Sequence, residues 1–243
     1  MVALRPIPAA PPTPSRFDLD ELADAHRLAD WMFDQFRPVL SDAVLEVGPG
    51  IGTFTERLLD AGAKRLLLVE PDPAFDVELE RRFGHDARVT LASDRVPGSA
   101  AIAATAGTWG LVLCQNVLEH VEDDAGAMDE LAGALRPGGA LALLVPAHPR
   151  LYGALDRTFG HHRRYTRDRV ASLVAGSGLE LADLYSFNLL GVPGWWVKNR
   201  AGARSLGPRS LAAYERMVGA WRTVEARRRP PWGLSLVAIA RRP

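Results

Sequence analysis

The sequence contains little cysteine and no long apolar run. Cys114 is the single cysteine among 243 residues, which excludes a disulfide scaffold and a cysteine-based zinc site and favours a reducing, cytoplasmic location. The proline-rich N-terminus lacks the apolar core of a signal peptide, and no stretch approaches the roughly 20 apolar residues that cross a bilayer. We therefore expect residues 1–16 to form a disordered tail and residues 17–243 to form a single domain.

Lysine is also scarce, and the charge is unevenly distributed although the net charge is zero. Residues 1–149 carry 12 basic and 23 acidic side chains, a net charge of −11, whereas residues 150–243 carry 17 and 6, a net charge of +11. Lysine occurs only at Lys64 and Lys198, which we interpret as compositional drift. With 47% hydrophobic and 24% charged residues, the composition is typical of a folded globular protein.

Predicted strands alternate with predicted helices, a pattern typical of an α/β protein with a doubly wound, mainly parallel sheet. The segments 148–169 and 188–232 interrupt the alternation, and we expect them to form lids or caps on the sheet. Strands are predicted at 43–47, 65–70, 88–92, 109–114, 140–145, 180–187 and 234–240, and helices at 18–36, 53–61, 72–83, 125–135 and 168–176.

A glycine-rich turn follows the first predicted strand. Gly48, Gly50 and Gly52 stand at a strand-to-helix junction, where α/β sheets bind ligands. Glu46 precedes the turn within an apolar strand, and Glu70 ends the next strand, where a carboxylate can bind ribose hydroxyls. A carboxylate at Glu46 would repel a pyrophosphate and attract an ammonium group. The pattern predicts a nucleoside-type ligand; the alternative is a tight turn with no ligand.

Four segments resemble, in the correct order, the motifs of class I S-adenosylmethionine-dependent methyltransferases. They are the glycine turn at 44–52, the acid in 69–72, the fourth-strand run 111–121 and the turn 135–139. The resemblance implies an enzyme with a Rossmann-like seven-stranded sheet, mostly parallel with an antiparallel last strand, plus a helical cap insertion. It also implies S-adenosylmethionine as cofactor and S-adenosylhomocysteine as product.

The same resemblance implies which residues contact the cofactor. The glycines would wrap the methionine part, Glu70 the ribose and Asp94 the adenine, although the usual glycine before Asp94 is absent. A capping or structural role is the alternative for Asn116 and Glu119. The implied set of cofactor-binding residues is Glu46, Gly48, Pro49, Gly50, Gly52, Glu70, Pro71, Asp94, Arg95, Gln115 and Asn116.

Methyl transfer from a sulfonium is an in-line displacement, and a general base helps when the acceptor must lose a proton. The candidates are His120, His148 and His161, each of which could instead only orient its loop. Run 148–165 resembles a subgroup of bacterial methyltransferases with a Gly-His-x-Arg-Arg-Tyr segment and no defined acceptor. Its arginines suit a carboxylate or phosphate, or form a solvated basic face. The predicted substrate-binding residues are Tyr152, Arg163, Arg164, Tyr165 and Trp195.

Glu119 and His120 are similar to part of the cation-binding run of some methyltransferases of this fold. Asn116 stands where that run has its first acid, and losing this charge weakens the binding of hard cations. We therefore expect no metal site.

The predicted function is methyl transfer to a small, anionic biosynthetic metabolite, because the basic half would face an acidic acceptor. The alternatives are a non-catalytic cofactor-binding relative with a regulatory or partner-binding role, or an RNA methyltransferase. No nucleic-acid partner is expected, since the arginines are dispersed and the aromatics are not interleaved for stacking. The tryptophans and arginines of 188–232 suit a cap over an amphipathic or lipid-linked acceptor, a peripheral membrane contact, a dimer face or core packing. The oligomeric state is left open.

Overall fold

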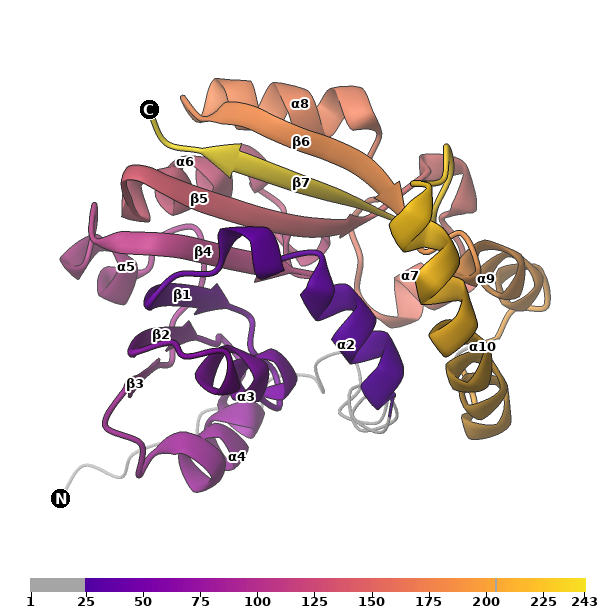
Figure 1. The fold of residues 1–243 in the computed structure, drawn as a ribbon, viewed down its shortest axis with the longest axis horizontal. Coiled ribbons are helices and arrows are strands. Elements are labelled where there is room, and N and C mark those ends of the chain that lie inside the picture. The colour runs from indigo at the N-terminus through magenta and orange to yellow at the C-terminus, as the bar shows by residue number, and fades with distance from the viewer. Residues whose placement is uncertain (1–24, 204) are drawn as a thin grey trace, which may run out of the picture.

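The computed structural model describes residues 25–203 and 205–243, which form a seven-stranded sheet with helices on both faces (Figure 1). The strand order is β3-β2-β1-β4-β5-β7-β6, and β7 alone is antiparallel to its neighbours. This confirms the predicted fold class. The strands are β1 (Ala43–Val47), β2 (Arg65–Val69), β3 (Val89–Ala92), β4 (Trp109–Gln115), β5 (Leu135–Pro146), β6 (Glu180–Phe187) and β7 (Ser235–Arg241).

The helices follow the apolar periodicity and the capping residues of the sequence. Asp72 accepts a hydrogen bond from the Ala74 amide at the start of α4, where proline stands in the first turn. The helices are α2 (His26–Asp34), α3 (Thr53–Asp60), α4 (Pro73–Phe83), α5 (Ala100–Ala104), α6 (Asp124–Ala134), α7 (Ala154–Thr158), α8 (Arg167–Gly176), α9 (Gly191–Arg200) and α10 (Pro208–Arg227). The predicted tail 1–16 and the first part of the predicted helix 18–36 lie outside the described residues.

One predicted boundary needs correction, and two short helices were missed. The segment 136–139, predicted as a turn before the fifth strand, belongs to β5, which begins at Leu135 and pairs there with Trp109. Backbone hydrogen bonds from the Gly138 amide to the Arg242 carbonyl and from the Arg242 amide to the Gly139 carbonyl extend the pairing. Helices α5 and α7 were not predicted, because five residues are too few to show helical periodicity.

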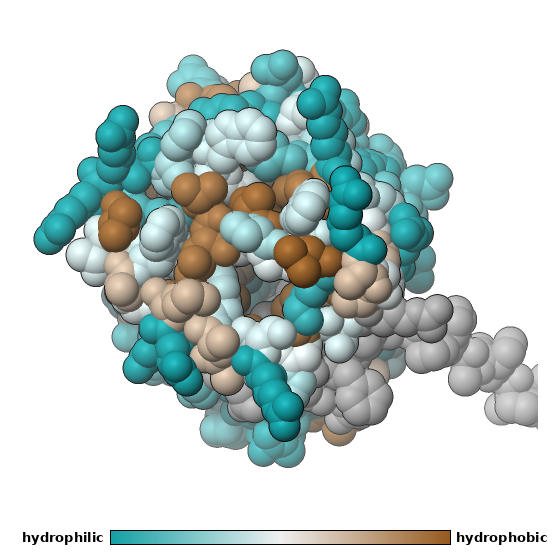
Figure 2. All heavy atoms as spheres, turned by 90° about the vertical axis from the view of Figure 1, so that its right-hand side faces the viewer, coloured by the Kyte–Doolittle hydropathy of each residue, from teal (hydrophilic) through white to brown (hydrophobic). Residues whose placement is uncertain are grey.

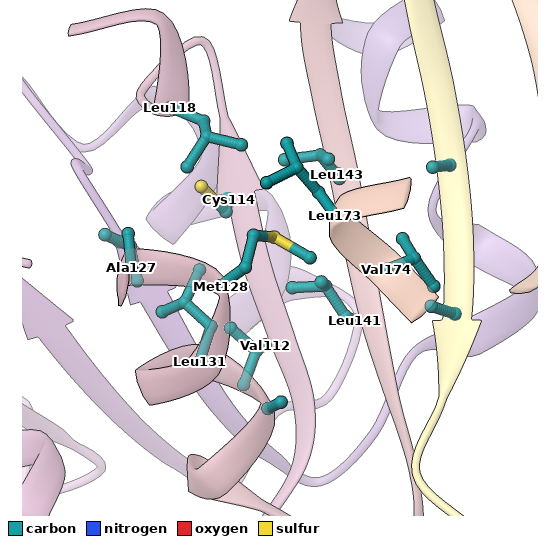
Figure 3. Packing of buried hydrophobic residues seen from close by; sticks show 14 of the residues in the cluster. Val112, Cys114, Leu118, Ala127, Met128, Leu131, Leu141, Leu143, Leu173 and Val174 are labelled. Atoms are coloured by element: carbon teal, nitrogen blue, oxygen red, sulfur yellow. The ribbon is translucent and has the colours of Figure 1, made fainter. Parts of the chain in front are cut away.

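The core consists of two layers, one on each face of the sheet. On one face, Met128 of α6 and Leu173 of α8 pack against Val112, Leu141 and Leu143 (Figure 3). The other face carries the apolar side chains of α2, α3, α4 and α10. Because both faces are covered, the central strands read as continuous apolar runs, which is why they could be recognised in the sequence.

The cap helices α9 and α10 stand at one end of the sheet (Figure 1). Glu215 of α10 accepts hydrogen bonds from the amides of Arg27 and Leu28 at the start of α2, at 3.0 and 2.8 Å. Glu225 of α10 accepts from the amides of Asn188 and Leu189 just before α9. Glu215 therefore ties α10 to α2, and Glu225 ties α10 to the segment between β6 and α9. Among the described residues, no helix is both long and apolar enough to span a bilayer.

Candidate functional site

A cavity of about 570 Å³ lies at the carboxyl ends of β1, β2 and β4, the edge of an α/β sheet where ligands bind. Residues of α2, α9 and α10 complete its wall, and most of its lining is apolar. Figure 2 looks onto this side of the molecule and shows a hollow bordered by hydrophobic residues, with hydrophilic side chains further out. The volume is sufficient for a nucleoside together with a small second molecule.

The glycine turn forms the floor of the cavity. Gly48, Gly50 and Gly52 all adopt positive φ angles, of 67°, 55° and 82°. A Cβ at Gly48 would overlap Val117, and a Cβ at Gly52 would overlap the Phe83 ring. Glycine is therefore required both by the backbone conformation and by the close approach of these side chains.

Glu46 and Glu70 stand beside this turn as predicted. Glu46 is 3% exposed and accepts a hydrogen bond from the Thr55 hydroxyl at 2.7 Å. Burial raises the pKa of Glu46 to about 7, with a further contribution from the charge of Glu70. Glu70 accepts from the Gly50 and Asp72 amides at 3.0 Å each, and burial raises its pKa as well. Both carboxylates, with Pro49 and Pro71, line the cavity.

The fourth-strand motif supplies the opposite wall. Gln115, Asn116, Glu119 and His120 all line the cavity. The Oε1 of Gln115 and the Oε2 of Glu119 are buried and have no hydrogen-bond partner among the described residues. Buried polar atoms are rarely left unpaired, so a ligand that satisfies them is expected here.

Asp94 and Arg95, the predicted adenine contacts, lie outside the cavity lining. Asp94 accepts hydrogen bonds from the Ser99 hydroxyl at 2.9 Å and the Ala101 amide at 3.2 Å. These hydrogen bonds lower the pKa of Asp94. The structure thus places its carboxylate at the start of α5, and its role in adenine binding stays a prediction.

Two of the three candidate histidines meet in the cavity. The His161 Nδ1 lies 3.0 Å from Oδ1 of Asp156, which is 0% exposed, and its Nε2 lies 4.0 Å from the Glu119 Oε1. The His120 and His161 rings meet edge to face, with their centroids 4.8 Å apart. His120 is exposed and opens onto the cavity, and partial removal from bulk water together with the nearby His161 lowers its pKa to about 4.

His148, the third candidate, lies outside the cavity lining. Its ring stacks on Trp232 at a centroid distance of 5.1 Å, and its φ angle is 59°. Burial lowers the pKa of His148. Its Nε2 is buried and has no hydrogen-bond partner among the described residues, and a role for His148 as a base stays a prediction.

Most of the predicted substrate-binding residues hold the wall of the cavity rather than line it. Arg163 pairs with Asp124 at 3.0 Å, and the buried Tyr165 donates to the Leu118 carbonyl at 3.0 Å. Tyr152 donates to the His161 carbonyl at 2.7 Å. Only Arg164 and Trp195 of the predicted set line the cavity.

Arg164 is buried and already neutralised. Its Nε donates to Oδ1 of Asp156 at 2.6 Å and its Nη1 donates to the Ala147 carbonyl at 3.0 Å. Asp156 thus serves Arg164 and His161 together, and the hydrogen bonds with His161 and Arg164 and the charge of Arg164 lower the pKa of Asp156 against the effect of burial. Lys198 lines the cavity, and Asp156 supports it by holding His161 and Arg164. Neither was among the predicted site residues, because no local sequence rule links them to the histidines.

Glu119, His120 and His161 are the cluster in the described part of the chain whose side chains could ligate a metal ion. Their ligand atoms lie within 4.8 Å of one another. Asn116 also lines this part of the cavity. The expectation of no metal stays a prediction, and its test is given below.

With this geometry in place, comparison with known proteins identifies the family. The family model described as a methyltransferase domain matches residues 20–184. The chain belongs to this family. The predicted membership of the S-adenosylmethionine-dependent methyltransferases is thereby confirmed, together with the cofactor.

Relatives of the methyltransferase domain differ in what they act on. The ubiquinone biosynthesis O-methyltransferase of Methylocella silvestris is 35% identical over 105 residues, 43% of this chain and 40% of that protein. The tRNA U34 carboxymethyltransferase of Cellvibrio japonicus is 31% identical over 125 residues, 49% of this chain and 38% of that protein. The chain thus spans less than half the length of these relatives.

A solved structure supports the fold. That of the N-methyltransferase NodS from Bradyrhizobium japonicum, in complex with S-adenosylhomocysteine, has a TM-score of 0.61 and 20% identity, and the match covers 94% of each chain. At 20% sequence identity, this similarity shows a shared fold and does not extend to the substrate.

The residues of the methyltransferase domain fit S-adenosylmethionine. Gly48 and Gly50 of the glycine turn line the cavity, where a backbone without side chains leaves room for a ligand, and Gly52 lies behind them against Phe83. Glu46 and Glu70 supply carboxylates for an ammonium and for hydroxyls, and the Gln115 Oε1 is a buried acceptor without a partner among the described residues. The ammonium and hydroxyl groups of the cofactor can donate hydrogen bonds to these carboxylate and amide oxygens.

Proposed function

We propose that this protein transfers a methyl group from S-adenosylmethionine to a hydroxyl oxygen of a small biosynthetic metabolite. The pairing of His161 with Asp156 in the cavity carries this proposal. A histidine whose Nδ1 is held by a buried carboxylate presents its Nε2 as a general base. A hydroxyl acceptor needs such a base because it must lose its proton when the new bond forms.

The cofactor side and the acceptor side have separate residues. Bound S-adenosylmethionine would supply the electrophilic methyl group of its sulfonium and, with the sulfur–methyl bond broken, would leave as the neutral thioether S-adenosylhomocysteine. Glu46 and Glu70, with the glycine turn, would hold this cofactor in one orientation. The His161 Nε2 accepts the proton of the acceptor hydroxyl as the oxygen–methyl bond forms, and Asp156 stabilises the resulting imidazolium.

The paired arginines favour a small molecule over RNA. Arg164 is buried against Asp156, and Arg163 and Arg169 share Asp124, so each of these guanidinium groups already has a carboxylate partner. Helices α9 and α10 also enclose the cavity, which leaves an apolar chamber of limited volume. An RNA methyltransferase would instead show RNA binding that weakens steeply with added salt.

A transfer assay tests the function. The protein is incubated with S-adenosylmethionine carrying a radiolabelled methyl group, together with a panel of hydroxylated aromatic and aliphatic metabolites or with bulk tRNA. We expect label in a hydroxylated small molecule and none in tRNA. Label confined to tRNA would support the RNA alternative, and cofactor binding without transfer to any acceptor would support the non-catalytic alternative.

Removal of divalent cations is expected to leave the methyl transfer unchanged, because His161 and Asp156 suffice to take the proton. The measurement compares initial rates after treatment with EDTA and after readdition of Mg²⁺, Mn²⁺ or Zn²⁺. A rate that EDTA abolishes and one of these ions restores would assign Glu119, His120 and His161 to a metal and would exclude His161 as the base.

Cofactor affinity is expected to rise about tenfold between pH 6 and pH 8. The pKa of Glu46 is about 7 in the free protein, so the carboxylate is mostly protonated at pH 6 and mostly ionised at pH 8. A cationic ligand binds the ionised form better, and hence binding strengthens as the pH rises through this value. Calorimetric titration with S-adenosylhomocysteine at several pH values measures the effect.

Glu46→Gln is expected to flatten this pH dependence, because its side chain cannot ionise. The exposed Asp60 at the end of α3 provides the control, since Asp60→Asn removes a nearby carboxylate from the surface and should keep the wild-type slope. An unchanged slope in Glu46→Gln would show that another group titrates.

A further inference from the structure

Lys198 on α9 is a pocket cation without a carboxylate partner. Its side chain is half-buried and lines the cavity, and no hydrogen bond or ion pair joins its Nζ to any other described residue. Arg164, the other strong cation of the lining, is neutralised by Asp156. Lys198 is therefore the cation of this wall that remains available to a ligand.

Trp195 stands one helical turn before Lys198 and offers a second donor. Its Nε1 is buried and has no hydrogen-bond partner among the described residues. The Arg164 guanidinium lies 4.6 Å from the centroid of the indole and holds its position. A buried N–H without an acceptor costs free energy, and a ligand oxygen would remove that cost. Residues three apart on a helix lie on the same face, so both donors can serve one group.

An aromatic side chain connects these donors to the proposed base. The Phe159 ring lies 5.9 Å from the His161 ring and 5.9 Å from the Trp195 ring, measured between centroids. All three residues line the cavity. His161, Phe159 and Trp195 thus form a row, with the His161 imidazole at one end, the Trp195 N–H at the other and the apolar Phe159 ring between them. This row suits a flat aromatic ligand that carries one polar group at each end.

The geometry of α9 is fixed relative to the base. Asn199, the neighbour of Lys198, accepts a hydrogen bond from the Leu155 amide at 2.9 Å and donates to the Leu151 carbonyl at 2.7 Å. The same short helix α7 carries Asp156, which holds His161. The donor pair and the base therefore belong to one connected wall.

We propose that Lys198 and Trp195 bind the carboxylate of a hydroxyaryl acid whose hydroxyl faces His161. The carboxylate would accept hydrogen bonds from the Lys198 Nζ and the Trp195 Nε1, and the ring would lie along Phe159. Helix α9 then determines which acceptor is used. This inference rests on the proposed function, because it names the class of acceptor for the same cavity.

The test uses two probes that differ in charge and hardly in shape, 3,4-dihydroxybenzoate and 3,4-dihydroxybenzamide. Each is titrated calorimetrically into protein saturated with S-adenosylhomocysteine. The wild type is expected to bind the carboxylate at least tenfold more tightly than the amide. Lys198→Met should remove this preference, Lys198→Arg should retain part of it, and Trp195→Phe should reduce it because the ring stays while the N–H is lost.

The other lysine of the chain provides the matched control. Lys64 is exposed just before β2, and Lys64→Met should keep the full preference. Equal affinity for the two probes in the wild type, a preference that survives in Lys198→Met, or no binding of either probe would overturn the inference. Affinity for S-adenosylhomocysteine, measured first for every variant, reports on folding and on the cofactor site, and methyl transfer to hydroxylated acceptors without a carboxylate reports separately on the proposed function.

Discussion

Replacing Gly50 with arginine is expected to abolish the binding of S-adenosylmethionine and S-adenosylhomocysteine. Gly50 lies on the floor of the cavity at a φ angle of 55°, and its amide donates to the Glu70 carboxylate at 3.0 Å. An arginine there strains the backbone, fills the space for the cofactor and places a cation where a cationic ligand must bind. We expect affinity for S-adenosylhomocysteine to fall by at least a hundredfold in a calorimetric titration, about 3 kcal/mol.

Gly62→Arg provides the matched control for backbone strain. Gly62 also has a positive φ angle, of 96°, but it follows α3 away from the cavity and has open space around it. The two variants share the strain of a left-handed arginine, so only the Gly50 variant should lose the cofactor. If Gly50→Arg kept its affinity within tenfold of the wild type, the cofactor would not bind across this turn.

Replacing His161 with alanine is expected to lower kcat for the methyl transfer by about 10² to 10⁴-fold, the usual contribution of a positioned general base. Affinity for S-adenosylhomocysteine should stay at the wild-type value, because His161 lies on the acceptor side with Glu119 and Asp156. Steady-state rates and calorimetry on the same preparation separate the two effects.

His148→Ala tests the specificity of this loss. His148 lies in the same segment but stacks on Trp232 outside the cavity lining. Its replacement should leave kcat within a few-fold of the wild type. Equal losses of kcat in the two variants would mean that the segment acts only by its fold, and a wild-type rate in His161→Ala would exclude this residue as the base.

The parts of the fold that could be predicted are those with a local physical signature. The strands of the sheet are continuous apolar runs because both faces are buried, and the glycines of the cofactor turn are required by positive φ angles and close contacts. The extension of β5 from Leu135 could not be predicted, since it depends on pairing with Trp109 of β4 and with Arg242, which follows β7 about one hundred residues later.

The acceptor side of the site shows the limit of sequence reasoning most clearly. Arg163 and Arg164 have the residue type that binds anions, but their partners Asp124 and Asp156 are supplied by the tertiary fold. A buried guanidinium must be paired, and only the structure shows with which carboxylate. Lys198 is one of two lysines, a scarcity that the sequence analysis interprets as compositional drift. Only the docking of α9 places this side chain in the cavity wall.

The charge asymmetry between the two halves of the chain also changes its meaning. The acidic first half and the basic second half neutralise each other within the fold, as in the ion pairs of Arg222 with Asp34 and of Arg163 with Asp124. The expectation of an anionic acceptor no longer rests on the total charge. It rests on the unpaired donors of α9.

Nuclear magnetic resonance of the reaction product shows directly whether the protein methylates a hydroxyl oxygen and whether His161 is needed. The protein is supplied with S-adenosylmethionine carrying a carbon-13 methyl group and with 3,4-dihydroxybenzoate as acceptor. If His161 is the base for O-methylation, we expect the wild type to form a labelled methoxy carbon on the acceptor and His161→Ala to lose this product. A labelled methyl group on carbon, or no labelled product from a protein that binds S-adenosylhomocysteine, would contradict it.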